Sequence, residues 1–122
     1  MSQKHPITCH VLDTTLGKPA AGVQVSLYAV DPADNKFTKT GYAETDSDGR
    51  ILKWTLTQGA FHASSTDVYR LVFEVEQYYK KLGMETFFPW VEIFVNAKDL
   101  LQEHYHVPLL LSPYSYSTYR GS

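Results

Sequence analysis

The sequence predicts an all-β fold, a two-sheet antiparallel sandwich of eight strands with one short helix. Three observations support this prediction. Apolar residues recur with a period of two along most of the chain, turn-forming residues interrupt it at short intervals, and one short stretch alone has a helical pattern. The 122 residues contain no internal repeat and no linker-like segment, so we expect a single domain over residues 1–122.

Four strands are expected in the first half of the chain, separated by segments rich in Gly, Pro, Asn and Asp. Their ranges are 7–12, 23–29, 37–44 and 50–56. The turn before the fourth strand, DSDG at 46–49, imitates a calcium-binding loop, but Thr55 stands where the closing glutamate of such a loop would be. We therefore interpret this segment as a hairpin turn that aims Arg50.

The second half of the chain adds four strands and the helix. The strands are expected over residues 68–75, 90–95, 105–111 and 114–119. The helix is expected over 76–82, because lysines occupy its last turn and Gly83 follows as a C-cap. The segment 87–95 and the C-terminal strand are long and apolar. If they are edge strands rather than central ones, they need pairing with a second copy, and we expect an oligomer built partly by sheet extension.

Composition narrows the range of partners. The chain has 11 basic and 13 acidic residues and a net charge of −2, which argues against nucleic acid and anionic membranes as partners. No apolar run approaches the length of a membrane span, and no secretory signal is evident. The single cysteine, Cys9, alternates with Ile7 and Val11, which predicts a buried structural thiol.

Histidines provide the clearest candidates for chemistry. His104 and His106 lie two residues apart in a predicted strand, so both project from one face. Together with His10 they could supply three imidazole ligands for zinc, but Arg50 in the same pocket would oppose a second cation. We interpret His104 as a surface residue. His106 leads into an apolar stretch, where its imidazole needs a partner.

Several segments together resemble the 5-hydroxyisourate hydrolases, the transthyretin-related enzymes of purine breakdown, and the resemblance covers essentially the whole chain. These segments are HVLD at 10–13, GKPA at 17–20, DGR at 48–50, YHVPLLLSPY at 105–114 and YRGS at 119–122. The terminal tetrapeptide is the most specific, because the hormone-carrier branch looks similar over 110–117. The resemblance implies a transthyretin-like fold and a homotetramer, a dimer of dimers, with active sites in a channel at the dimer–dimer interface.

The same resemblance implies hydrolytic opening of a cyclic amide in 5-hydroxyisourate, which gives 2-oxo-4-hydroxy-4-carboxy-5-ureidoimidazoline. The catalytic residues it implies are His10, Arg50, His106 and Ser122, and the substrate-binding residues are His10, Arg50 and Tyr119. Either His10 or His106 would be the general base, because imidazole titrates near neutral pH. Arg50 would stabilise charge on the carbonyl. Ser122 would act through its hydroxyl or the terminal carboxylate.

No metal and no organic cofactor are expected. We expect the cytoplasm as the compartment, or the peroxisome or periplasm if a presequence was removed. Two alternatives stay open. A small-ligand carrier on the same fold would have apolar side chains in place of the imidazoles and guanidinium, and a zinc-dependent hydrolase would lose activity on exhaustive chelation.

Overall fold

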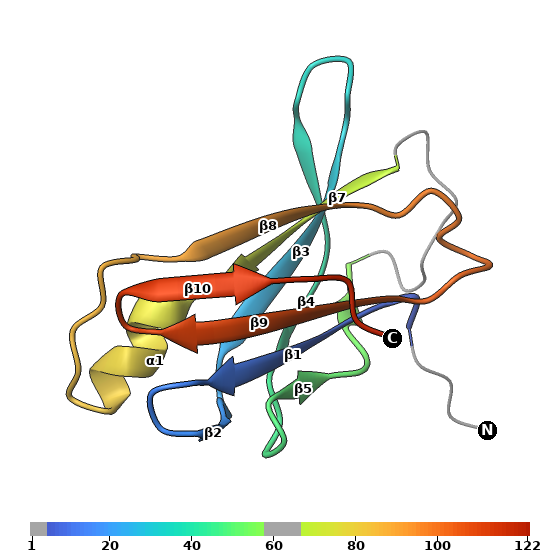
Figure 1. Cartoon of the computed structure of the whole chain (residues 1–122). Coiled ribbons are helices and arrows are strands. Elements are labelled where there is room, and N and C mark those ends of the chain that lie inside the picture. The colour runs from blue at the N-terminus through green and yellow to red at the C-terminus, as the bar shows by residue number, and fades with distance from the viewer. Residues whose placement is uncertain (1–4, 58–66) are drawn as a thin grey trace.

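Two β-sheets pack face to face in this computed structural model, which describes residues 5–57 and 67–122 (Figure 1). One sheet has the order β10-β9-β1-β2, with β5 also paired to β1, and the other has the order β6-β4-β3-β7-β8. The elements are β1 (Ile7–Asp13), β2 (Lys18–Pro19), β3 (Gln24–Val30), β4 (Phe37–Glu44), β5 (Arg50–Ile51), β6 (Thr55–Leu56), β7 (Val68–Phe73), α1 (Val75–Lys81), β8 (Val91–Asn96), β9 (Tyr105–Ser112) and β10 (Ser115–Thr118). The predicted sandwich with one short helix is confirmed for the described part of the chain.

The predicted strand over 50–56 is divided between the two sheets. Its first residues form β5 and pair with β1, whereas its last residues form β6 and pair with β4. Trp54 holds the crossing segment in place, because its indole Nε1–H donates to the carbonyl of Ile7 at 2.7 Å and its backbone N–H donates to Nδ1 of His5 at 3.0 Å. An unbroken strand could not supply pairing partners to both sheets.

One pair of strands departs from the predicted antiparallel arrangement. β1 and β9 run parallel, in a register that extends from Ile7 opposite Tyr105 to Asp13 opposite Leu111. Period-two alternation looks the same in either direction, so the sequence pattern could not distinguish the two pairings. The parallel register matters for the site, because it places Thr8 opposite His106.

The short helix begins one residue earlier than predicted. β7 ends at Phe73, and Val75 is the first residue of α1 rather than the last of the strand. Gly83 ends the helix as predicted, with φ +70° and an N–H that donates to the carbonyl of Lys80 at 3.0 Å. A positive φ at this position favours glycine because it has no side chain.

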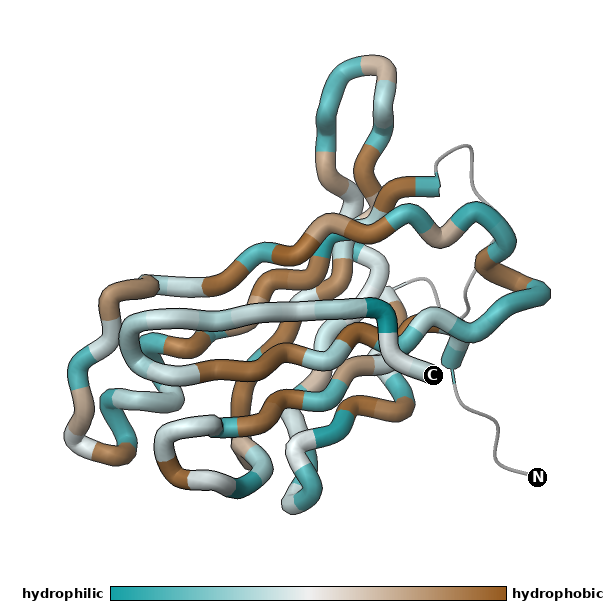
Figure 2. Tube along the Cα trace, in the orientation of Figure 1, coloured by the Kyte–Doolittle hydropathy of each residue, from teal (hydrophilic) through white to brown (hydrophobic). Residues whose placement is uncertain are grey.

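The core lies between the inner faces of the two sheets. Hydrophobic residues recur along the strands of both sheets (Figure 2). Fully buried members include Cys9, Val11, Leu71, Phe73 and Leu109. The prediction that Cys9 is a buried structural thiol is confirmed, and burial raises its pKa far above the usual range, which keeps it protonated and unreactive. Complete burial of an apolar side chain such as that of Val11 or Leu71 contributes about 1.5–3 kcal/mol.

The two apolar segments that were expected to need a pairing partner, 87–95 and the C-terminal strand, both form strands at sheet edges. β8 ends one sheet and β10 ends the other. Large apolar side chains on and beside these strands remain exposed: Trp90, Phe94, Tyr114 and Tyr116. Unpaired edges of this kind favour association with a further strand. Among the described residues, no helix is long and apolar enough to cross a bilayer.

Candidate active site

The predicted site residues meet on the outer face of the sheet that contains β9, β1 and β5, three strands that lie side by side (Figure 1). His10 is opposite Arg50 across the β1–β5 pair, and Thr8 is opposite His106 across the β1–β9 pair. Paired residues project from the same face, as do residues two apart along a strand. The alternate residues in these strands, including Cys9 and Val107, are buried in the core. The imidazoles and the guanidinium therefore share the face that points away from the second sheet.

His10 is held by the turn that precedes Arg50. Its Nε2 lies 2.8 Å from the carbonyl oxygen of Asp48. A carbonyl can only accept a hydrogen bond, so Nε2 carries a proton and the lone pair of the neutral ring is on Nδ1. The rings of His10 and His106 have their centroids 6.4 Å apart. Both imidazoles could therefore face one small substrate.

The turn before Arg50 is stabilised by hydrogen bonds to the side chain of Asp46. Oδ1 of Asp46 accepts the backbone N–H groups of Asp48 and Arg50, each at 2.9 Å. Gly49 has φ +73°, and a Cβ there would lie 2.3 Å from the carbonyl oxygen of Val11. Only glycine fits such a position. The predicted turn leading to Arg50 is present, but it does not close a hairpin. It joins β4 of one sheet to β5 of the other, because β4 pairs with β6 and β5 pairs with β1. This turn positions His10 as well as Arg50.

The terminal segment packs on His106. The backbone N–H of Gly121 donates to the carbonyl of His106 at 2.9 Å and forms an isolated antiparallel bridge with it. A Cβ at Gly121 would lie 2.6 Å from Cδ2 of the His106 ring. The Cγ–Cδ2 edge of the ring therefore faces Gly121, and Nε2 is the ring nitrogen bonded to Cδ2. The YRGS tetrapeptide is therefore next to the imidazole.

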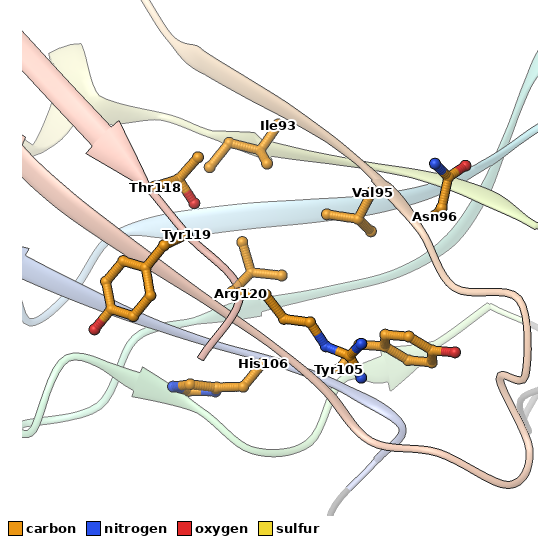
Figure 3. A pocket seen from close by; sticks show the side chains of 9 residues that line it. Ile93, Val95, Asn96, Tyr105, His106, Thr118, Tyr119 and Arg120 are labelled. Carbon is orange, nitrogen blue, oxygen red and sulfur yellow. The ribbon is translucent and has the colours of Figure 1, made fainter. Parts of the chain in front are cut away.

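Tyr119 and Arg120 line a cavity of about 270 Å³ (Figure 3). The guanidinium carbon of Arg120 is 4.8 Å from the centroid of the Tyr105 ring, and one of its nitrogens is 4.0 Å from Oε1 of Glu103. Other residues that line the cavity include Ile93 and Val95 of β8. His106 lines it too, but His10 and Arg50 do not. Ser122 follows Gly121 and is exposed.

Two features of the site were missed from the sequence. Thr8 is completely buried, and its Oγ1 lies 2.8 Å from Nδ1 of His106 and 2.9 Å from Nε2 of His104. It supplies the partner that His106 was expected to need. His104 is exposed, as predicted, yet its ring stacks beside that of His106 with centroids 6.2 Å apart. The alternation of Thr8 with His10 was the one available signal for the shared face.

The same imidazoles were candidate zinc ligands in the sequence. Over 5–57 and 67–122, no three side chains of His, Cys, Asp or Glu are arranged to hold a metal ion. The Nε2 of His10 faces a backbone carbonyl, and Thr8 lies within hydrogen-bond distance of the other two rings. This geometry arranges the imidazoles as hydrogen-bonding groups.

A first prediction follows from the contact between Gly121 and His106. Gly121→Ala should lower kcat by about 10- to 100-fold, because the new methyl group displaces the imidazole from its position. The midpoint of thermal unfolding should change little, since the substitution lies outside the core. The control for kcat is Gly17→Ala, which introduces the same methyl group with nothing within 4 Å of the new Cβ. Gly17 has φ +67°, so this control should lose some stability but keep its kcat. Equal kcat for Gly121→Ala and the unaltered protein would contradict the proposed packing role.

The sequence matches the HIUase/transthyretin family over residues 7–121. A probable 5-hydroxyisourate hydrolase from Caenorhabditis elegans is 46% identical over 120 residues, which span 95% of this chain and 81% of that protein. The 5-hydroxyisourate hydrolase 2 of Rhizobium meliloti is 42% identical over the full length of both chains. Among solved structures, sea bream transthyretin in complex with thyroxine has a TM-score of 0.81 and 31% identity, covering 95% of this chain and 94% of that one.

Proposed function

Because this chain belongs to the HIUase/transthyretin family, we propose that it is an enzyme that hydrolyses 5-hydroxyisourate in urate degradation. Relatives at 46% and 42% identity carry that activity in their names. The observation that carries the proposal is the placement of His10, Arg50 and His106 on one face of the sheet, with the YRGS segment packed against His106.

The proposed chemistry is attack of water on a carbonyl of the cyclic amide. His106 takes a proton from water at Nε2 while the water oxygen adds to the carbonyl carbon. The carbon–nitrogen bond of the ring then breaks, and the departing nitrogen takes the proton from His106. The product is 2-oxo-4-hydroxy-4-carboxy-5-ureidoimidazoline. We assign the base to His106, whose imidazole is bonded to Thr8 and packed against the terminal segment, and we give His10, held on the turn through Nε2–H, the role of orienting substrate or water.

His10, Arg50, Tyr119 and Ser122 complete the proposed site. Arg50 offers a planar set of donors to the oxygens of the substrate and stabilises the charge that develops on the carbonyl. His10 orients substrate or water beside it. Tyr119 holds the substrate ring, and Ser122 contributes a polar group at the end of the segment.

A second prediction follows from the proposed role of Arg50. Arg50→Ala should lower kcat/KM by about 100-fold or more, because it removes the cation that stabilises the transition state. Lys53→Ala is the matched control. Lys53 is exposed, carries the same charge as Arg50 and lines, together with Arg50, a shallow hollow that also includes Glu44 and Asp46. Its removal should therefore leave the steady-state parameters near those of the unaltered protein. If both variants lose activity equally, the effect comes from net charge and the specific role of Arg50 is wrong.

We further propose a homotetramer, a dimer of dimers. The apolar edges β8 and β10 give each chain two strands that a second copy could extend. A second dimer covering the outer face would turn the open surface at His10 and His106 into a channel. Native mass measurement and sedimentation test this arrangement, and a monomer at micromolar concentration would refute it.

The experiment that tests the function must separate an enzyme from a carrier on the same fold. Freshly generated 5-hydroxyisourate is added in large excess over protein, and its ultraviolet absorbance is followed. An enzyme removes many equivalents faster than the spontaneous reaction does. A carrier removes at most one equivalent for each site and leaves the remainder to decay spontaneously, which would overturn the proposal. A parallel sample treated exhaustively with chelator should keep its rate, and loss of that rate would favour the zinc-dependent alternative.

A further inference from the structure

One hydroxyl group lies between two imidazoles beside the proposed site. Oγ1 of Thr8 is 2.8 Å from Nδ1 of His106 and 2.9 Å from Nε2 of His104. Thr8 has no exposed surface, although it lies on the outer face of its sheet. Burial of a polar group is tolerated where its hydrogen bonds are made, so both contacts matter for this hydroxyl.

The number of available protons limits which group donates and which accepts in these two hydrogen bonds. A threonine hydroxyl has one proton to donate, and each neutral imidazole has one N–H and one lone pair. When both rings are neutral, Thr8 therefore donates to one of them and accepts from the other. Two patterns satisfy this rule, and they leave opposite tautomers on His106.

The two patterns differ in what they leave on Nε2 of His106. If Thr8 donates to His106, the lone pair is on Nδ1 and Nε2 carries the proton. If Thr8 accepts from Nδ1–H of His106 and donates to Nε2 of His104, the lone pair is on Nε2. Nε2 is bonded to Cδ2, the ring atom nearest to a Cβ at Gly121, whereas Nδ1 is the nitrogen beside Thr8. Only the second pattern gives His106 a basic nitrogen on the substrate side.

We propose that Thr8 is a positioning residue that fixes the tautomer of His106, and that His104 orients the Thr8 hydroxyl by accepting a hydrogen bond from it. This inference rests on the proposed role of His106 as general base. In this arrangement Nδ1–H of His106 points at Thr8 both before and after Nε2 takes up a proton. No hydroxyl has to rotate during the reaction, and the base is therefore organised in advance.

His104 contributes less to this arrangement than Thr8 does. Its ring is exposed and stacks beside His106 at an interplanar angle of 26°. A water molecule could accept the hydrogen bond from the Thr8 hydroxyl if the His104 imidazole were removed, whereas nothing else on β1 could replace the Thr8 hydroxyl opposite His106. The expected order of effects is therefore Thr8 first and His104 second.

Substitutions at Thr8 test the inference. Thr8→Val keeps the shape of the side chain and removes the hydroxyl, so kcat should fall by about 10- to 100-fold with little change in KM. Thr8→Ser keeps the hydroxyl and should restore most of kcat. His104→Ala should lower kcat by less than Thr8→Val does. The control is Thr45→Val, which removes another buried hydroxyl, bonded to the backbone of Val23 and Ala20. It should lower stability without lowering kcat.

Nitrogen-15 NMR of the imidazole side chains gives a readout that needs no turnover. At a pH well above the usual imidazole pKa, His106 should carry its proton on Nδ1 in the unaltered protein. Thr8→Val should shift that population toward Nε2–H, and Thr8→Ser should not.

The inference is overturned by a proton on Nε2 of His106 in the unaltered protein, by full kcat in Thr8→Val, or by failure of Thr8→Ser to restore kcat. The proposed function fails in a different way. In that case the unaltered protein does not accelerate decay of 5-hydroxyisourate, whatever tautomer His106 shows.

Discussion

Replacing His106 with alanine should lower kcat for 5-hydroxyisourate by about 100- to 10,000-fold, the usual contribution of a positioned general base. The imidazole lies next to the terminal segment through Gly121 and has its Nδ1 bonded to Thr8. Removing the imidazole takes away the nitrogen, Nε2, that is proposed to accept the proton from water. KM should change much less than kcat, because the group acts on water rather than on the substrate ring.

The structural effect of His106→Ala should be small. His106 is half-buried on the outer face, and its backbone carbonyl still accepts the N–H of Gly121 in the variant. The thermal midpoint and native mass should stay near those of the unaltered protein. Gln102→Ala, at an exposed position shortly before β9, is the control for substitution near this strand. Turnover within a few-fold of normal in His106→Ala would remove His106 from the mechanism.

Deleting residues 119–122 should have a comparable effect on catalysis. The deletion removes Tyr119 and Ser122, and it also removes the Gly121 backbone that packs against the His106 ring. We expect kcat/KM to fall by about 100-fold or more, since the loss combines substrate contacts with the position of the base.

Stability should respond much less to this deletion. Most of the removed side chains are exposed, and the core consists of residues elsewhere in the chain. The lost backbone bond from Gly121 to His106 contributes about 0.5–1.5 kcal/mol. Turnover, thermal midpoint and native mass are measured together, and a bulky tag after Ser122 is compared with the same tag before Met1. The C-terminal tag should also lower turnover, because it crowds the site.

Two results would contradict this account of the segment. A truncated oligomer with full activity would mean that residues 119–122 do not act in the site. A truncated protein that dissociates would mean that these residues hold the assembly together instead.

The sequence pattern predicted which face of each strand is buried better than it predicted which strands pair with each other. Alternation correctly placed Cys9 and Val11 in the core and His10 outside it. It could not show that residues 50–56 serve both sheets, because β5 and β6 continue one alternating pattern. It could not show that β1 and β9 are parallel either. Pairing depends on contacts between distant parts of the chain, which a local pattern does not contain.

The site shows the same limit. Resemblance identified His10, Arg50, His106 and the YRGS segment, and the structure brings all of them to one region. Thr8 was missed, because a threonine in a strand is ordinary. Its importance comes from the register with His106, a residue 98 positions away. The reason for glycine at position 121 was also hidden, since it depends on the approach of the His106 ring.

The central claim is that substrate reacts on the outer face of the sheet rather than in the neighbouring cavity. A crystal structure of the inactive His106→Ala protein soaked with 5-hydroxyisourate tests this claim most directly. We predict that the ligand ring lies over β1 and β9, between His10, Arg50 and Tyr119, with oxygens facing the Arg50 guanidinium. A ligand lodged between β8 and β10, against Ile93 and Val95 and away from His10 and Arg50, would contradict it.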